Sequence, residues 1–153
     1  MNMGGFEKSF KLWRPEIIML LSLFLGILTH YFPSYLHAQR IDGYHSLYSR
    51  AVPYEANWSI ICSIIAIILG VYENYKIMHG KSEDYLKPLW YFGLLGINFA
   101  YGYHIRDLMM FLDTLFCEMF NPKVVSISIG LGYFFLLFQL IFFAIACFAT
   151  LFK

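Results

Sequence analysis

The stretch VVSISIGLGYFFLLFQLIFFAIACFATLF, Val124 to Phe152, contains no charged residue and decides the fold. It is longer than the roughly 20 apolar residues that a helix needs to cross the hydrocarbon core of a bilayer. Three further runs lack charge, at Ile17–Leu36, Ala56–Tyr72 and Pro88–Tyr103. The sequence therefore predicts four transmembrane helices, over about 16–36, 56–74, 88–103 and 124–152.

The composition is that of a membrane protein. Of the 153 residues, 59% are hydrophobic and 14% are charged, whereas about 25% are charged in an average soluble domain. Because the chain has no repeat and no linker, and because short connections make successive helices antiparallel, we expect one domain. It would be an all-α integral membrane protein, 1–153, with an up-down-up-down bundle. The net charge of +1, with no run of Lys and Arg, excludes a nucleic-acid-binding face.

The first predicted helix has Pro15 at its start, where the missing N–H has no intrahelical partner to lose. The lysines and arginines then predict its orientation, because cytoplasmic segments carry an excess of both. The side of the termini would hold Lys8, Lys11, Arg14, Lys76, Lys81, Lys87 and Lys153, and the other side Arg40, Arg50, Arg106 and Lys123. We therefore expect a multi-pass protein with both termini on the cytoplasmic, or equivalent, side.

The stretch YGYHIRDLMMFLDTLF, Tyr101 to Phe116, follows the third apolar run and introduces ionisable side chains. Continuing the third helix to residue 120 would make it about 50 Å long, which exceeds the bilayer core. A helix over 105–120 would place polar residues, among them Arg106, Asp107 and Asp113, on one face and Leu, Met and Phe residues on the other. We therefore predict an amphipathic helix in the membrane interface, between the third and fourth transmembrane helices.

Two loops opposite the termini, 33–55 and 104–123, are expected to dock partner proteins. Tyr combined with Arg is typical of protein interfaces, and the aromatic belt at a membrane surface does not by itself require so long a first loop. The predicted partner-binding residues are Tyr35, Arg40, Tyr44, Tyr48, Arg50, Arg106, Asp107 and Asp113.

Small and amide-bearing residues within the apolar runs predict where helices pack. Small residues four apart let two helix backbones approach closely. A side-chain amide in a membrane helix needs a hydrogen-bond partner because lipid offers none, although a substrate contact is the alternative use for it. The predicted helix-packing residues are Gly93, Gly96, Asn98, Ala100, Ser126, Gly130 and Gln139.

Histidine beside carboxylate is the chemistry of metal binding or proton handling. His104 and Asp107 are three residues apart, and His30 lies on the same predicted side of the membrane. The chain has no tight ligand pair such as HxxxH, so these three are candidate ligands only in an alternative hypothesis. In that alternative the protein binds a metal, or binds haem between His30 and His104. We predict no cofactor and no metal site.

No pattern typical of an enzyme occurs in the sequence. There is no GxSxG, no HExxH and no pair of carboxylates within the apolar runs. The expected function is therefore that of a non-enzymatic accessory or structural subunit of a larger membrane protein complex. Its partners would be the lipid bilayer and other membrane proteins.

A second alternative follows from the outline of the chain, which has both termini inside, a long first outer loop and a short basic inner turn. In helix number and loop lengths it is similar to the four-helix immunity proteins that protect bacteria from pore-forming bacteriocins. The resemblance covers this outline and no motif. It implies a membrane-resident inhibitor that contacts the pore segment of a toxin through a helix face, here the face of Gly96 and Ala100.

Overall fold

The computed structural model describes residues 3–33, 36–41, 43–48, 53–80, 86–101, 109, 112–113, 116 and 119–152. For residues 3–8, 36–38, 40, 43–48 and 53–55 it describes the backbone alone. In chain order the elements are α1 (Met3–Thr29), β1 (Leu36–Arg40), β2 (Gly43–Tyr48), α2 (Pro53–Met78), α3 (Leu86–Tyr101), β3 (Val124–Ile129) and α5 (Leu131–Ala149).

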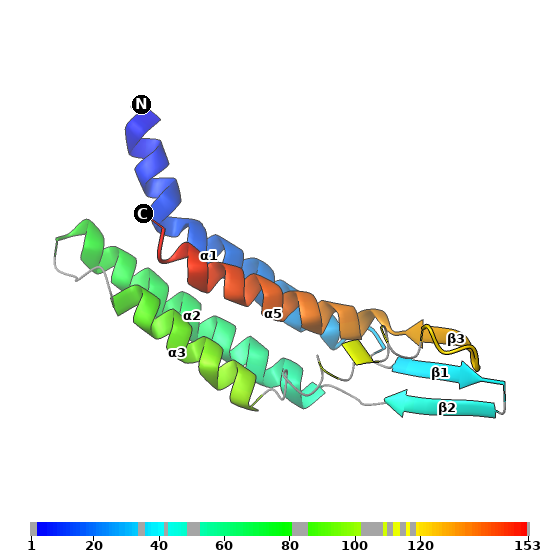
Figure 1. The fold of residues 1–153 in the computed structure, drawn as a ribbon. Helices are drawn as coiled ribbons and strands as arrows, with labels where there is room; N and C mark the ends of the chain where they lie inside the picture. Colours follow the sequence, from blue (N-terminus) through cyan, green and yellow to red (C-terminus); the bar gives the residue numbers. More distant parts are fainter. Residues whose placement is uncertain are drawn as a thin grey trace.

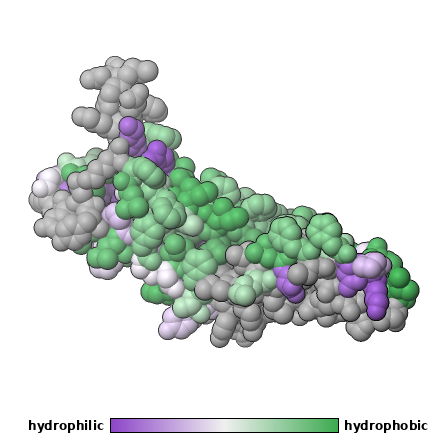
Figure 2. All heavy atoms as spheres, in the orientation of Figure 1, coloured by the Kyte–Doolittle hydropathy of each residue, from purple (hydrophilic) through white to green (hydrophobic). Residues whose placement is uncertain are grey.

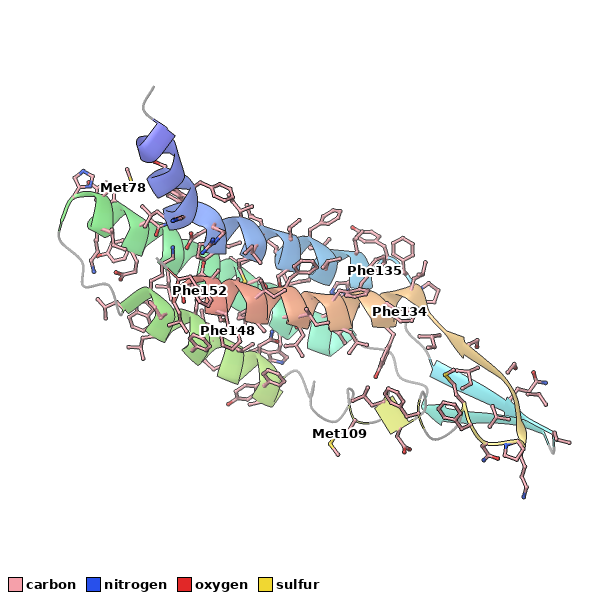
Figure 3. The ribbon with its side chains drawn as sticks, turned by 45° about the horizontal axis from the view of Figure 1, so that its top comes forward. Met78, Met109, Phe134, Phe135, Phe148 and Phe152 are labelled. Carbon is pink, nitrogen blue, oxygen red and sulfur yellow. The ribbon has the colours of Figure 1, made fainter. Side chains whose placement is uncertain are left out.

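The helices form an elongated bundle with a small sheet at one end (Figure 1). α1 packs along α5 and against α2, and α2 packs along α3. The three strands lie together at one end of the bundle, and the end of α5 lies at the other, where α1 enters it. In Figure 3, Met109, Phe134 and Phe135 lie toward the sheet, whereas Met78 and Phe152 lie toward the opposite end, called here the terminal end.

Three helices are long and apolar enough to cross a membrane: Ser9–Thr29 in α1, Ala56–Met78 in α2, and α5. Their outward side chains are large and apolar, such as Phe24, which is 57% exposed, and Ile68, which is 61% exposed. Figure 2 shows hydrophobic residues over the middle of the visible face and hydrophilic ones toward its two ends. Such a continuous apolar surface suits lipid, because soluble monomers rarely expose so large a patch. The fold is that of a helical membrane protein.

The core of the bundle combines small residues with large aromatic ones. Small side chains let helices approach, and the aromatic rings fill the remaining space at the density typical of protein interiors. The buried core residues are Met19, Cys62, Ala66, Tyr91, Leu94, Phe143, Ala146 and Cys147.

The sheet is antiparallel, with strand order β2-β1-β3. β1 and β2 come from the predicted first loop, whereas β3 directly precedes α5. A register shift between Gln39 and Arg40 leaves Val125 of β3 without an opposite residue, which makes it the extra residue of a β-bulge. Segments distant in sequence are thus joined by backbone hydrogen bonds at one end of the bundle.

Backbone and side-chain contacts fix the sheet to the helices. The Gly132 amide donates to the Pro33 carbonyl over 2.9 Å, beside the start of α5. The ring of Tyr133, fully buried, packs against Ile127 and Ile129 of β3. The sheet is therefore anchored on the first turn of α5.

The structure corrects the predicted boundaries of the first and last helices. α1 covers Met3–Thr29 rather than 16–36, so Pro15 lies inside it rather than at its start. α5 begins at Leu131, and the residues predicted as its first turns form β3 instead. α2 and α3 lie within a few residues of the predicted 56–74 and 88–103. The predicted interfacial helix over 105–120 falls mostly outside the described residues.

The prediction of an all-α protein is incomplete for a physical reason. Val124–Ile129 alternates apolar and small polar residues after its first valine pair and is rich in β-branched side chains, both of which favour a strand. We predicted a helix for this segment because it lacks charged residues, but a strand can lack them equally well. The sequence Asp42-Gly43, a common hairpin signal, likewise stands where β2 begins, at Gly43.

We expect the β1–β3 register to be detectable by cross-linking. Gln39 and Ser126 are opposite residues, and the Ser126 hydroxyl donates to Gln39 Oε1 over 3.2 Å. Because opposite residues of antiparallel strands suit disulfide geometry, the variant Gln39→Cys/Ser126→Cys should oxidise readily in a Cys117→Ser background. Protection of the two thiols from a maleimide reagent measures the reaction.

The control is Gln39→Cys/Ile127→Cys, whose second thiol points to the other face of the sheet. Equal protection of both pairs, or of neither, would contradict the register.

Candidate functional site

Buried polar and charged residues gather between α1, α2 and α3 near the terminal end of the bundle. Glu16 is 4% exposed and Lys87 is 6% exposed, while Asn74 and Tyr91 are fully buried. These four residues are called here the Lys87 cluster. Charged groups are rarely buried in membrane proteins without a partner, so their contacts identify the best candidate site.

The Lys87 ammonium group is surrounded by oxygen atoms. Lys87 Nζ lies 2.9 Å from Glu16 Oε1 and donates to Glu16 Oε2 over 3.0 Å. It also donates to Asn74 Oδ1 and to the Leu12 carbonyl oxygen, each over 2.8 Å. An ammonium group has three N–H donors, and these four oxygens occupy them.

The Glu16 carboxylate is surrounded by donors in the same way. Besides Lys87, Asn74 Nδ2 donates to Glu16 Oε2 over 3.0 Å. The Tyr91 hydroxyl donates to Glu16 Oε1 over 2.9 Å. The cluster thus pairs one negative and one positive charge and hydrogen-bonds both, which is the condition under which buried charges are tolerated.

Lys87 also contacts the interrupted turn of α1. Proline cannot donate the hydrogen bond to the carbonyl four residues earlier, and its ring distorts that turn of a helix. Pro15 therefore weakens the turn that contains Leu12. Since Lys87 Nζ binds the Leu12 carbonyl before Pro15 and the Glu16 carboxylate after it, Lys87 connects the two parts of α1.

Gly70 of α2 leaves the space that the cluster needs. A Cβ at this position would collide with Glu16 Oε1 and lie 2.7 Å from the Tyr91 hydroxyl oxygen. Because Gly70 has no side chain, the Glu16 carboxylate and the Tyr91 hydroxyl can hydrogen-bond to each other beside α2.

The arrangement holds three helices together. The charges of Glu16 and Lys87 neutralise each other, and both groups are saturated with partners from the chain itself. In the part of the chain that the structure describes, no group of three or more His, Cys, Asp or Glu residues is placed to hold a metal ion.

Two further polar contacts join buried side chains of neighbouring helices, away from the Lys87 cluster. Ser22 Oγ of α1 donates to the Gln139 carbonyl oxygen of α5 over 2.9 Å and accepts from Gln139 Nε2 over 3.1 Å. Ser59 Oγ of α2 donates to Asn98 Oδ1 of α3 over 3.0 Å. Each amide thus hydrogen-bonds to a serine of another helix, which holds that pair of helices together.

The predicted small-residue contacts are placed differently. Gly93, Gly96 and Ala100 lie on the exposed face of α3, and a Cβ at either glycine would meet no atom within 4 Å. A contact of this face with another chain stays a prediction. Ser126 and Gly130 do not share a helix face, because Ser126 is in β3 and Gly130 is the N-cap of α5.

The predicted partner-binding residues are only partly described. The backbones of Arg40, Tyr44 and Tyr48 lie in β1 and β2, and Asp113 is exposed. His30, a candidate metal ligand, is exposed beyond the end of α1. The predicted residues that lie outside the described part of the chain are Tyr35, Arg50, His104, Arg106 and Asp107.

The sequence analysis missed the Lys87 cluster because it used Glu16 and Lys87 to bound apolar runs and to orient the chain, and did not consider them as partners of each other. A signal was nevertheless present. Glu16 and Lys87, of opposite charge, each stand directly before an apolar run at the same predicted side of the membrane, and Asn74 is the last residue of the predicted helix 56–74 on that side. Opposite charges at one level of neighbouring helices predict an ion pair.

Comparison with known proteins adds no relative: no protein-family model, no curated protein and no solved structure matches the chain. The fold and site themselves define the class. It is a helical membrane protein with a buried ion pair near one end of the bundle and a three-stranded sheet at the other.

We expect Lys87→Met to lower the free energy of unfolding by about 3–5 kcal/mol, because it leaves the Glu16 carboxylate buried without its counter-charge. Glu16→Gln/Lys87→Met should recover a large part of that loss, since it leaves no buried charge. Unfolding of the purified protein in mixed micelles, followed by circular dichroism, measures both variants. A double variant no more stable than Lys87→Met would contradict the ion pair.

We expect Gly70→Ala to destabilise the bundle by about 1–3 kcal/mol, the usual cost of overpacking a filled site. Gly93→Ala is the matched control, because it adds the same methyl group to a membrane helix at a position with open space. The same unfolding assay compares them. Equal stability of the two variants would show that the cluster tolerates a Cβ from α2.

Proposed function

We propose that the protein is a non-enzymatic accessory subunit of a larger membrane protein complex, and that it docks its partner through the sheet and the segments beside it. In this proposal both termini lie on the cytoplasmic side, where the predicted excess of Lys and Arg lies. The sheet then projects on the opposite side of the membrane.

A fourth crossing by α3 is part of this proposal. At about 1.5 Å per residue, the segment Leu86–Tyr101 is about 24 Å long. It begins with Lys87 in the Lys87 cluster and ends at Tyr101, whose ring stacks on that of Trp58 with centroids 5.2 Å apart. Aromatic residues gather at membrane interfaces, so an ion pair near one end and an aromatic pair at the other support a helix that spans the bilayer.

An interfacial position of the segment after α3 is supported by its exposed apolar side chains. Met109, Phe116 and Met119 are 60–65% exposed, and Phe120 is 78% exposed. Each belongs to the face that the sequence pattern assigns to lipid, and Figure 3 shows Met109 at the sheet end. Large apolar side chains at this level are stabilised by the headgroup and acyl boundary.

One observation carries the docking role: the sheet joins two strands of the first predicted docking loop to β3, which directly follows the second, and the outer edge of β3 is open in the described part of the chain. β1 pairs with β2 and β3, and within the described residues no strand pairs with the outer edge of β3. An open hollow beside it is lined by Met119, Val124, Val125, Ser126, Ile127 and Ile129. An unpaired strand beside an apolar hollow fits an extended segment of a partner, which would pair with the edge and fill the hollow with a side chain.

Absence of catalysis and of a cofactor remains part of the proposal. The strongest candidate site, the Lys87 cluster, uses its charged groups on each other. A subunit that braces helices and offers a docking surface needs no further chemistry.

The test is photo-cross-linking in the native membrane with a benzophenone amino acid in place of Val125, which is 60% exposed on β3. We expect one protein adduct, with the same partner recovered in a one-to-one complex from gentle detergent. Val125→Asp should abolish the complex. The control places the photo-reactive residue at Ile68, which is equally exposed but lies on a membrane-spanning helix.

A chain that purifies alone and forms no adduct from the sheet would contradict the subunit role. If the captured protein were instead a pore-forming toxin, the immunity-type inhibitor would replace the accessory subunit as the proposed function. An adduct from Ile68 but not from the sheet would move the docking surface to the helices.

A further inference from the structure

The first twelve residues of α1, Met3–Arg14, form an arm that leaves the bundle. Figure 1 shows α1 bending where it meets the end of α5, and Figure 3 shows the same arm turning away from the other helices. Pro15 supplies the reason for the bend, because a proline inside a helix removes one hydrogen bond and distorts the preceding turn.

Contacts on both sides of Pro15 hold this bend in place. Lys87 Nζ binds the Leu12 carbonyl of the arm and the Glu16 carboxylate of the bundle. Arg14 Nη2 reaches the Phe152 carbonyl oxygen over 3.5 Å, beyond the end of α5. The arm therefore departs at a level defined by the bundle, at the terminal end of the membrane-spanning helices.

The arm is amphipathic in its helical register. Met3, Phe6, Phe10 and Trp13 recur at spacings of three and four residues and so share one side of the helix. Phe10 is 49% exposed, although it is an aromatic residue on that side. Contact with a lipid surface would remove this ring from water.

The other side of the arm is basic. Lys8 and Lys11 lie on it with Glu7, and Arg14 adds a third positive charge near the bend, so three positive charges and one negative charge give the arm +2. Lys11 is exposed. A helix with Phe and Trp on one face and Lys on the other is the pattern of helices that lie in the membrane interface and attract anionic lipids.

We propose that Met3–Arg14 lies along the membrane surface as a lipid-binding arm, with its aromatic side toward the acyl chains and Lys8 and Lys11 bound to the phosphates of anionic lipids. This inference rests on the membrane location of the bundle and not on partner docking. The sheet and the arm lie at opposite ends of the molecule, so the two proposals fail independently.

The experiment uses the full chain with a fluorescent label on a single cysteine, Phe10→Cys or Lys11→Cys, in a Cys117→Ser background. Cys62 and Cys147 are buried, and the parent chain without the added cysteine measures their labelling. The protein is reconstituted into vesicles of phosphatidylcholine alone or with phosphatidylglycerol. Acrylamide reports contact with water, and lipids with a nitroxide near the headgroup report contact with the bilayer.

The label at position 10 should be quenched by nitroxide lipid and protected from acrylamide, whereas the label at position 11 should show the reverse. Phosphatidylglycerol should lower acrylamide quenching at position 10 about twofold or more, and high salt should reverse this effect, because attraction of lysines to an anionic surface is screened by ions. Lys8→Gln/Lys11→Gln should remove the difference between the two vesicle types.

Lys123→Gln is the matched control, since it removes an exposed lysine at the sheet end. It should leave the label at position 10 unchanged. Equal acrylamide quenching at positions 10 and 11 would overturn the surface position of the arm. If acrylamide quenching at position 10 did not change with phosphatidylglycerol, with salt or with substitution of the two lysines, the recognition of anionic lipid would be overturned.

Discussion

A buried ammonium group must find an oxygen atom for each of its N–H bonds, and Lys87 finds them on two other helices. Leu12 and Glu16 of α1 and Asn74 of α2 converge on this one nitrogen of α3. Once that geometry is required, Tyr91 follows as a further donor to the carboxylate, besides Lys87 and Asn74, and Gly70 follows as the position that must lack a side chain. The relative depth of α1 and α3 thus depends on one ion pair, because sliding either helix would separate buried charges. The amide of Asn74 holds α2 at the same depth, since it hydrogen-bonds to both charged groups.

The two ends of the bundle are joined by different forces. Near the terminal end, side chains of the Lys87 cluster connect the helices. At the other end the backbone does so, since β1 pairs with both β2 and β3 and the Gly132 amide binds the Pro33 carbonyl. Between them the helices meet through apolar packing, with Ser22 and Gln139 hydrogen-bonded in its middle. These polar contacts are therefore buried between the helices, where the surrounding lipid does not reach them.

The sequence located the three helices that are long and apolar enough to cross a membrane, with shifted ends, and missed the sheet. Long apolar runs are nearly sufficient to locate membrane-spanning helices, because the hydrocarbon core admits few charges. Charge-free runs do not mark where a helix stops, and the strand at Val124–Ile129 was hidden within one. The start of α1 was misplaced for a related reason: Pro15 suits a helix start, yet proline is also tolerated inside a membrane helix when neighbouring groups support the distorted turn. Here Lys87 binds the Leu12 carbonyl in the turn before Pro15.

The candidate site was predictable only in part. Opposite charges at Glu16 and Lys87 could have been paired from topology, but the convergence of Asn74, Tyr91 and the Leu12 carbonyl depends on helix rotation, which the sequence alone does not fix. Gly70 shows the limit most clearly. A glycine in a membrane helix has many uses, and only the coordinates reveal that this one faces a carboxylate.

The pairing of α1 with α5 and of β1 with β3 also determines when this protein can fold. α1 and β1 leave the ribosome long before α5 and β3, so the Ser22 hydroxyl and the edge of β1 opposite β2 have no partner while α2 and α3 are made. Contacts between such distant parts of a chain form late. The native bundle is therefore completed only after the last helix has been inserted, and until then the edge of β1 that β3 will cover stays open.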